Sequence, residues 1–537
     1  MSGAHLTVIG SSGESMKGAI AAGHPLTAAA GARILEEGGN AVDACVAAAF
    51  AGWVTESPLT GPGAGGFALI VPADGRPARL ADFFVATPGL GRRPPERAPM
   101  HAIDVGFGGD GATTQVFRIG EASCAVPGAA AGLGAIHAAY GSLPWAELLR
   151  PAIELARAGV ELTRSQAHLH AILDLILRHD TEGRRLYSRP DGGRMVPGDV
   201  LRLDGLDETL ARIAAEGPDV LYRGELASRV AATVAAGGGT ITTADLDAYR
   251  VVWRRPVRIN YRGHEVVSNP PPSSGGVLIA YGLSLLERVG AGAPGSAEWI
   301  ASLVEVMREQ SRARADGFVA GLYRGGLVQR LLSATQIDAA VARIDAGAGG
   351  APEHAPSGGT THVSVVDGAG AAASLSSSTG SGSGVLVPGT GIQLNNMLGE
   401  YDLVAGGPAA PGRRLTSMMA PTVVIGERGP RLVVGSAGSI RLRGAIMQVI
   451  ANVVGQGLGV AEAIDEPRVH VDEPHVHCEG GFEPVELKRL EALGYDVIPW
   501  RRRNLYFGGT NAVEVLPDGT LAAAGDARRG GDGIVVS

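Results

Sequence analysis

The chain has 537 residues, of which 45% are hydrophobic and 19% are charged, as in an ordinary globular protein with a large core. Its net charge of −8 and the lack of a dense Lys/Arg stripe argue against a nucleic-acid partner. The three cysteines, Cys45, Cys124 and Cys478, are too scattered to predict a disulfide framework.

The N-terminal residues give no targeting signal. Residues 1–20 lack a basic start followed by an apolar run, which argues against a signal peptide. The apolar stretch "AVDACVAAAFAGWV" is too short to span a membrane and carries Asp43. We therefore expect no membrane partner and a cytoplasmic location, unless an upstream segment directs the protein to the periplasm or outside the cell.

The first two thirds of the chain are predicted to be rich in helices. Residues 24–54 predict two helices, the first closed by "EEGGN", and "FALIVPADG" predicts a buried strand that enters a turn. Three further helical segments are expected, and two short strands before a proline turn lie between the last two of them. The predicted segments are helical 129–160, helical 207–249, two strands within 257–268 and helical 277–343.

The last third changes to short strands. After a loop at 345–359, the segments "THVSVVD", "AAASLSS", "PTVVIGE", "PRLVVGS" and "NAVEV" predict strands, with one helix at 441–458. Asp367-Gly368 is a hairpin-like turn signal between the first two strands. These features predict one α+β or layered unit, in which the loop joins parts of one sheet rather than two independent domains.

Two familiar patterns carry little weight. Gly61, Gly63 and Gly66 match GxGxxG, but a strand rather than a helix is expected to follow, so nucleotide binding is not supported. "RVHVDEPHVHCE" gathers His470, His475 and His477, but its alternation fits the polar faces of strands better than the spacing of a zinc site. The sequence has no GxSxG, HExxH or Walker motif.

The junction between Gly359 and Thr360 stands out. Two glycines precede a threonine that begins a predicted strand. A threonine at a newly made N-terminus has a hydroxyl nucleophile and an α-amine that serves as its base. Cleavage by attack of the Thr360 hydroxyl on the Gly359 carbonyl would expose both groups. The alternative is a surface loop that ends at a β-branched residue.

Longer motifs support the first interpretation. "HPLTAAAGARILEEGGNAVDACVAAAF", "LYRGELA" and "YRGHEVVSNPPPSSGG" resemble the large subunit of the γ-glutamyltransferase family. "TTHVSVVDGAG", "GTGIQLNN", "LTSMMAPT", "VVGSAGS" and "EPRVHVD" resemble its small subunit, in the same order. The resemblance extends from about residue 20 to the end of the chain.

The resemblance implies an N-terminal nucleophile (Ntn) hydrolase with an αββα sandwich, matured by autocatalytic cleavage into residues 1–359 and 360–537. Thr360 matches the family nucleophile, and Ser378 takes the place of a second threonine whose hydroxyl supports it. Gly438 and Ser439 match the glycine pair whose backbone amides form the oxyanion hole. No metal or organic cofactor is implied. The two fragments would form one heterodimer or a pair of heterodimers.

The residues that bind the substrate depart from the family pattern. Phe84 stands where an arginine would clamp the substrate's α-carboxylate, and Gly380 stands where the family has asparagine. Losing the clamp should cost about 1.5–3 kcal/mol or more. Phe84 would be simple core if another arginine, Arg441 or Arg413, replaced the clamp.

Two further motifs also lose residues that bind the substrate in the family. "LNNMLGE" keeps Asn395 but has Met397 for glutamine and Glu400 for the amine-binding aspartate. Ser417 keeps one hydroxyl of a serine pair, and Met418 replaces the other. The residues for the family's chemistry are thus retained, while most of those that bind the charged groups of an α-amino acid are replaced.

The expected function is hydrolysis of a small-molecule amide other than a standard γ-glutamyl amide, through an acyl ester on Thr360. Three alternatives remain at this stage. The chain could be a genuine γ-glutamyltransferase that acts on glutathione-like donors. It could cleave an oxalyl carbon–carbon bond in natural-product biosynthesis. It could also be an unprocessed, non-catalytic binding protein.

Overall fold

A computed structural model describes residues 7–8, 16–91, 98–106, 114–290, 292–315, 317–347, 359–404, 409–438 and 441–537. Most of the loop predicted at 345–359, and Ser439 of the predicted oxyanion hole, therefore lie outside the described residues. None of the helices within these ranges is long and apolar enough to cross a membrane.

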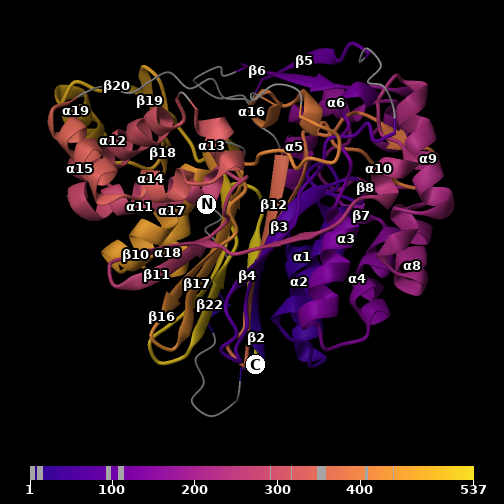
Figure 1. Cartoon of the computed structure of the whole chain (residues 1–537), viewed down its shortest axis with the longest axis horizontal. Coiled ribbons are helices and arrows are strands. Elements are labelled where there is room, and N and C mark those ends of the chain that lie inside the picture. The colour runs from indigo at the N-terminus through magenta and orange to yellow at the C-terminus, as the bar shows by residue number, and fades with distance from the viewer. Residues whose placement is uncertain are drawn as a thin grey trace.

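Two seven-stranded sheets lie at the centre of the protein (Figure 1). The first has the order β1 (Thr7–Val8), β22 (Leu521–Ala524), β21 (Gly509–Val515), β17 (Gly429–Ala437), β16 (Thr422–Gly426), β11 (His264–Ser268) and β10 (Val257–Tyr261). The second has the order β23 (Asp532–Val536), β2 (Gly18–Ala22), β12 (Gly359–Asp367), β13 (Ala372–Gly380), β3 (Gly65–Val71), β4 (Arg79–Phe83) and β9 (Val252–Arg254). Each sheet combines strands from both sides of Gly359, which confirms the expectation of one unit.

Helices cover the outer face of each sheet, so the layers run helix, sheet, sheet, helix (Figure 1). Beside the second sheet lie α1 (Pro25–Glu36), α2 (Ala41–Thr55), α3 (Ala129–Tyr140), α4 (Trp145–Ala158), α8 (Leu206–Glu216) and α9 (Gly224–Ala236). Beside the first lie α11 (Gly275–Val289), α12 (Ala297–Ala313), α15 (Ala334–Asp345), α17 (Arg441–Ile450) and α18 (Val460–Asp465). This arrangement is the predicted αββα sandwich.

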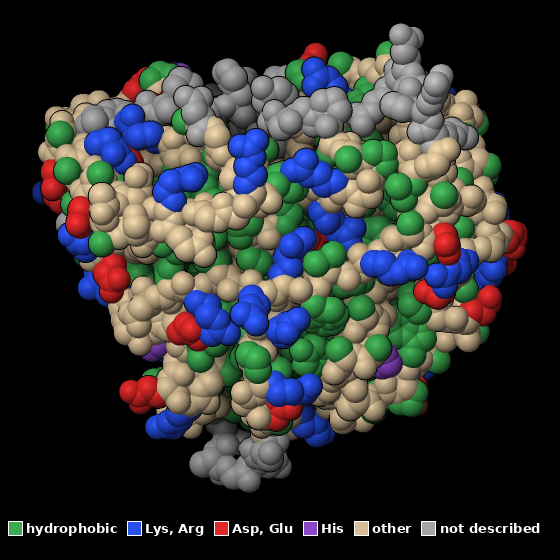
Figure 2. Space-filling view, in the orientation of Figure 1, with side chains coloured by type: hydrophobic (Ala, Val, Ile, Leu, Met, Phe, Trp, Pro, Cys, Tyr) green, Lys and Arg blue, Asp and Glu red, His purple; other side chains and the backbone are tan. Residues whose placement is uncertain are grey.

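Shorter elements connect these layers. The helices are α5 (Arg164–Ile172), α6 (Asp174–Leu177), α7 (Thr181–Leu186), α10 (Thr243–Asp247), α13 (Phe318–Arg324), α14 (Leu327–Leu331), α16 (Tyr401–Val404) and α19 (Pro484–Ala492). The strands are β5 (His101–Gly106), β6 (Thr114–Ile119), β7 (Val160–Glu161), β8 (Val200–Leu201), β14 (Leu386–Val387), β15 (Ile392–Gln393), β18 (Val469–Asp472), β19 (His475–Cys478) and β20 (Asp496–Pro499). On the face in Figure 2, Lys and Arg side chains stand singly or in small groups among uncharged ones.

Strand β2 shows why the sheets divide the core into two parts. Ala19 and Ala21 belong to one hydrophobic cluster, together with Val433 of the facing sheet. Ile20 and Ala22 belong to the other, which contains the buried side chains of α1 and α2. Because successive side chains of a strand point to opposite faces, one strand contributes to both clusters.

The two sheets approach closely at His362 of β12. A Cβ on Gly435 of β17 would lie 2.2 Å from Cε1 of this imidazole, so only glycine fits there. The ring nitrogens of His362 bond to the hydroxyls of Ser376 and Ser364 at 2.8 and 2.9 Å. Burial lowers the pKa of His362 to about 3, which keeps it neutral. This contact fixes the strand that begins at the predicted cleavage junction.

Two expectations need correction. The helix predicted at 441–458 is an α-helix only to Ile450, and a π-helical turn follows at Ala451–Gly455. His470 and His477 were expected on polar strand faces, but both are buried because Tyr506 and Trp500 pack against this strand pair.

Candidate active site

Thr360 lies at an irregularity in the pairing of β12 with β13. Gly359 pairs with Gly380, whereas Thr361 pairs with Ser377. One residue of β12 therefore faces two residues of β13, Ser378 and Thr379. Such β-bulges redirect side chains and are common beside active sites.

Ser378 contacts the bond that is predicted to break. Its hydroxyl donates a hydrogen bond to the carbonyl oxygen of Gly359. The backbone N–H of Gly380 in turn donates to Ser378 Oγ at 2.8 Å. A side chain on Gly359 would lie 2.6 Å from Leu59 Cδ2 and 2.8 Å from the carbonyl oxygen of Gly380. The junction is therefore tightly enclosed, and the carbonyl of the predicted cleavage site already has a donor aimed at its oxygen.

A cavity opens beside Thr360. It brings together eight of the residues that the sequence singled out: Phe84, Thr360, Ser378, Gly380, Met397, Glu400, Ser417 and Met418. The other lining residues are Ser274, Arg314, Phe318, Val319, Leu322, Leu403, Thr416, Met419 and Leu442. The lining is thus largely apolar, with hydroxyl groups, one arginine and one carboxylate.

Phe84 is held firmly in the wall of this cavity. Its ring stacks on Phe67 with centroids 5.4 Å apart, and only 1% of the residue is exposed. The hydroxyl of Tyr249 donates to the Phe84 carbonyl at 2.7 Å. Phe84 therefore serves as core and cavity wall together, and its position offers no charged group to a substrate.

Gly380 has no room for the asparagine that the family resemblance places there. Its φ is +73°, a conformation that favours glycine. A Cβ would lie 2.1 Å from Asn396 Oδ1 and 2.9 Å from Glu400 Oε1. Asn396 and Glu400 thus occupy the space beside the predicted nucleophile.

Asn395 does not line the cavity. Its side-chain amide donates to the carbonyls of Gly63 and Ala125 at 2.8 Å, and its oxygen accepts from the N–H of Ala125 at 3.0 Å. These bonds tie three segments together. The structure therefore places Asn395 as a support for the turn that carries Met397.

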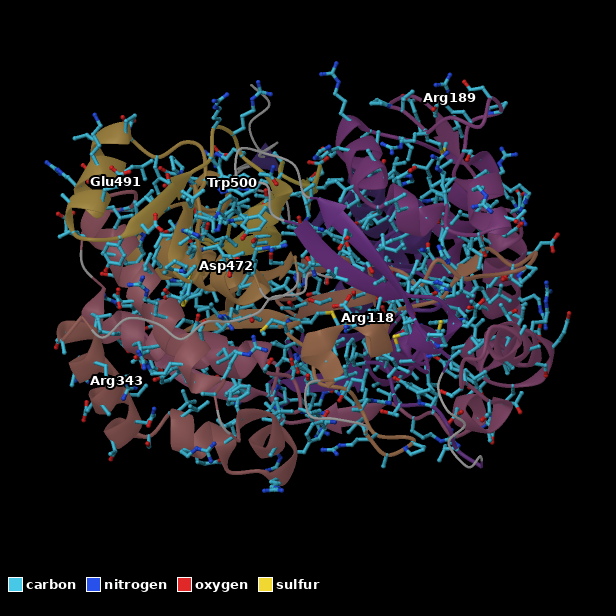
Figure 3. The ribbon with its side chains drawn as sticks, turned by 90° about the horizontal axis from the view of Figure 1, so that it is seen from above. Arg118, Arg189, Arg343, Asp472, Glu491 and Trp500 are labelled. Carbon is cyan, nitrogen blue, oxygen red and sulfur yellow. The ribbon has the colours of Figure 1, made fainter. Side chains whose placement is uncertain are left out.

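The 3₁₀ turn at Met397–Gly399 has a second support in the β5–β6 hairpin. Asn396 Nδ2 donates to the carbonyl of Arg118 in β6 at 3.3 Å. Figure 3 shows Arg118 near the middle of the molecule when it is viewed from above.

Ser417 lines the cavity and also forms hydrogen bonds that hold the neighbouring backbone. Its Oγ accepts from the N–H of Met419 at 3.0 Å, and its carbonyl accepts from the hydroxyls of Ser273 and Ser274. Gly438 directly follows β17 and has φ +126°. With Ser439 outside the described residues, the oxyanion hole stays a prediction.

A second cavity also reaches Thr360, and sequence reasoning missed it. Glu56, Thr361 and Arg529 line it. Thr361 Oγ1 donates to Glu56 Oε2 at 2.6 Å, and Thr27 Oγ1 donates to Oε1 at 3.1 Å. The one sequence feature that could have indicated this site is Glu56, an acidic residue directly after the apolar helix α2.

Burial governs the charges in this second cavity. It raises the pKa of Glu56 to about 7, although the hydroxyls of Thr361 and Thr27 and the charge of Arg529 oppose the shift. Burial also lowers the pKa of Arg529 to about 10. Glu56 therefore changes charge near neutral pH, while Arg529 remains a cation there.

Neither arginine considered as a replacement clamp lines the first cavity. Arg413 is exposed and stacks on Tyr323, with its guanidinium carbon 3.5 Å from the ring centroid. Arg441 is buried over Tyr506 at 4.1 Å. The arginine that does line the cavity is Arg314, which the sequence did not indicate.

The histidine-rich strands β18 and β19 are a packing element. His477 Nδ1 accepts from Trp500 Nε1 at 3.1 Å, and burial lowers the pKa of His477 to about 4. Among the described residues, no three His, Cys, Asp or Glu side chains are grouped to hold a metal ion. Figure 3 shows Asp472 and Trp500 in the same C-terminal part of the molecule.

An αββα sandwich with a threonine at the start of a central strand, beside a cavity, defines the Ntn-hydrolase class. Comparison with known proteins assigns the chain to one family of this class. The sequence model of the family described as Gamma-glutamyltranspeptidase matches residues 27–536, and the chain belongs to that family.

Curated relatives cover nearly the whole chain. The chain is 33% identical over 531 residues to the Acylase ACY 1 proenzyme of Pseudomonas sp. strain SE83, covering 97% of this chain and 94% of the relative. It is 32% identical over 528 residues to the Glutathione hydrolase proenzyme of Escherichia coli K12, covering 93% and 88%. A solved structure, cephalosporin acylase from Bacillus halodurans, matches with a TM-score of 0.81 and 26% identity over 99% of this chain and 96% of that one.

Proposed function

We propose that this protein is a self-processing amidohydrolase in which Thr360 is the nucleophile for both its own cleavage and substrate turnover. One observation carries the proposal: the carbonyl of Gly359, directly before Thr360, is hydrogen-bonded to Ser378, and Thr360 lines a cavity with apolar and hydroxyl side chains. The relatives named proenzymes support a precursor that matures into two chains.

Maturation requires only groups of the chain and water. Thr360 Oγ attacks the carbonyl carbon of Gly359, and the developing oxyanion accepts the hydrogen bond from Ser378. The C–N bond breaks, and the nitrogen of Thr360 takes the hydroxyl proton, leaving an ester. Water then hydrolyses the ester, which gives a carboxyl group on Gly359 and a free amine and hydroxyl on Thr360. Residues 1–359 and 360–537 remain together as a heterodimer.

Turnover repeats this chemistry on a substrate. The α-amine of Thr360 takes the proton of Oγ as that oxygen attacks the amide carbon. The ammonium returns the proton to the leaving nitrogen when the C–N bond breaks. Water hydrolyses the acyl ester and releases the acid. The backbone amides of Gly438 and Ser439 are proposed to hold the oxyanion, and the scheme requires no cofactor.

The acyl site favours a group other than the γ-glutamyl group. Phe84 presents a ring stacked on Phe67 at the family arginine position, and Met397 and Met418 add apolar surface. Desolvating a free α-amino acid against such walls is costly unless its charges are paired. The relative named as an acylase supports this assignment.

A γ-glutamyltransferase is the second candidate, and one observation favours it. Arg314 and Glu400 both line the cavity, so its lining contains side chains of both charges, as the carboxylate and ammonium of an α-amino acid would require. Turnover of a γ-glutamyl anilide that exceeds turnover of simple acyl anilides would select this function.

Denaturing intact-mass spectrometry tests the nucleophile. The wild type should give two masses that meet between Gly359 and Thr360, and Thr360→Ala should give one full-length mass. Thr360→Ser is the matched control because it keeps a hydroxyl, and it should still be cleaved. One full-length mass for the wild type under all conditions would instead support a non-catalytic binding protein.

A further inference from the structure

We infer that the second cavity, which Glu56 and Thr361 line, is a binding site for a small monovalent anion such as chloride, with Arg529 as its cation. The ion would be a resident of the fold rather than a substrate. Binding at this site requires neither cleavage at Gly359 nor turnover by Thr360, so it goes beyond the proposed function.

Arg529 brings to this cavity a positive charge with no acceptor beside its Nε. It lies in the turn between β22 and β23 and lines the cavity. Its Nε is buried, and no hydrogen-bond acceptor among the described residues reaches that atom. The guanidinium is charged at neutral pH because burial lowers its pKa only to about 10, and Arg441 adds a second positive charge near it. A buried charge without a counterion is unfavourable.

The carboxylates close to Arg529 in the turn are already shared by other arginines. Asp526 accepts from Arg468 Nη2 at 2.7 Å and from Arg528 Nη1 at 3.2 Å, and Glu479 lies 2.6 Å from Arg528 Nη2. Within the described parts of the chain, no carboxylate forms an ion pair with Arg529, and Asp526 attracts it only at longer range. Two carboxylates therefore face three arginines, which leaves one positive charge in excess.

Glu56 faces the same cavity and balances Arg529 only when it is ionised. Its two carboxyl oxygens accept hydrogen bonds from threonine hydroxyls, and its pKa of about 7 leaves it neutral on the acidic side of that value. The histidines on this side do not change charge there, because burial lowers the pKa of His170 and of His24 to about 4. An external anion and the ionised carboxyl group of Glu56 therefore compete for one cation.

The rest of the lining limits the kind of anion that suits the site. Apolar side chains form part of the walls: Pro58, Leu59, Leu169, Ala437 and Leu505. Ser165 also lines the cavity, and its Oγ is 3.1 Å from the ideal Cβ position of Gly530, so a hydroxyl lies close to the turn that carries Arg529. One guanidinium balances one negative charge, and apolar walls penalise strongly hydrated, doubly charged ions such as sulfate. A halide meets both conditions.

Calorimetric titration of the wild-type protein with sodium chloride tests the site, in sodium gluconate at fixed ionic strength. We expect saturable binding at pH 6 and no saturable binding of sulfate. Binding of chloride should be about tenfold weaker at pH 8, because only the fraction of molecules with a protonated Glu56 then binds the ion well. Glu56→Gln should bind chloride equally at both pH values.

Arg529→Met should abolish chloride binding at pH 6, and Arg529→Lys should retain part of it. Arg413→Met is the matched control, because this arginine is exposed, stacks on Tyr323 and does not line the cavity. It should bind chloride as the wild type does. Lack of saturable binding by the wild type at pH 6, or undiminished binding by Arg529→Met, would overturn the assignment.

Crystals of the wild type soaked in sodium bromide at pH 6 give a second readout if Arg529→Met fails to fold. An anomalous difference peak beside the guanidinium of Arg529 is expected. Peaks confined to the outer surface would indicate an adventitious ion only and refute the site. Intact mass reports cleavage independently of both measurements, so a failure of the anion site and a failure of the proposed function are distinguishable.

Discussion

The hydroxyl of Ser378 donates a hydrogen bond to the carbonyl oxygen of Gly359, across the junction that precedes Thr360. The donor comes from β13 and the acceptor from β12, at the point where the pairing of these strands is irregular. A carbonyl polarised in this way is prepared for attack from the adjacent hydroxyl, because charge that develops on its oxygen meets a donor already in place.

Removal of this donor should slow maturation. We expect Ser378→Ala to reduce the rate of autocleavage by about a hundredfold, the usual effect of losing one oxyanion donor. Ser378→Thr should retain cleavage because it keeps the hydroxyl. The rate is measured by intact mass during incubation of freshly made precursor. Ser383→Ala is a control in the same serine-rich run, since that hydroxyl donates to the Leu394 carbonyl and accepts from the N–H of Val385 rather than contacting Gly359, and a similar delay there would contradict the prediction.

Asparagine at position 380 should destabilise the protein. The Cβ of Gly380→Asn would lie 2.1 Å from Asn396 Oδ1, at a φ of +73°. We expect a loss of about 1–3 kcal/mol, measured by urea unfolding. Gly370→Asn is the matched control, because Gly370 has φ +87° and no atom within 4 Å of its Cβ position. Equal losses in both variants would assign the effect to backbone conformation rather than to crowding.

The carboxyl of Glu56 should make stability depend on pH. Its pKa is raised from 4.5 to about 7 by burial, so the folded state retains a proton that the unfolded state releases between these values. Stability from this group is complete below pH 4.5 and is lost as pH rises through 7, by about 3 kcal/mol in total. Urea unfolding of Glu56→Gln should lack this component.

The pH series is best made in the Thr360→Ala background, which is expected to unfold as one chain. Exposed Glu154→Gln is the control and should follow the parent curve. If Glu56→Gln has the same pH slope as its parent, the pKa of Glu56 does not differ between the folded and unfolded states and the assignment fails.

Placing the family arginine at position 84 should not restore binding of a γ-glutamyl substrate. Phe84→Arg would remove the ring that stacks on Phe67 and place a charge in a site that is 1% exposed. We expect a loss of about 3–5 kcal/mol and no gain in γ-glutamyl anilide turnover. Thermal unfolding and the anilide assay measure the two outcomes. Phe84→Leu, which keeps an apolar side chain, should lose less stability, and a stable, active arginine variant would contradict this prediction.

Local patterns in the sequence determined much of the architecture. The caps and apolar periodicity around residues 24–54 predicted α1 and α2, and the valine alternation after Thr360 predicted β12. These elements depend on neighbouring residues, so their signals are readable along the chain. The ordered motifs of the second half, together with those of the first, also identified the family and predicted the cleavage junction.

Only the tertiary structure decided which side chains surround the junction. Glu56, Arg314 and Arg529 reach the cavities beside Thr360 from three distant segments, and none forms part of a local motif. Asn395 lies in a motif that matches the family, yet its side-chain amide donates hydrogen bonds to the backbone carbonyls of Gly63 and Ala125 instead of lining the cavity. The physical reason is that a strand or helix forms from local periodicity, whereas the surroundings of a side chain depend on how separate layers pack.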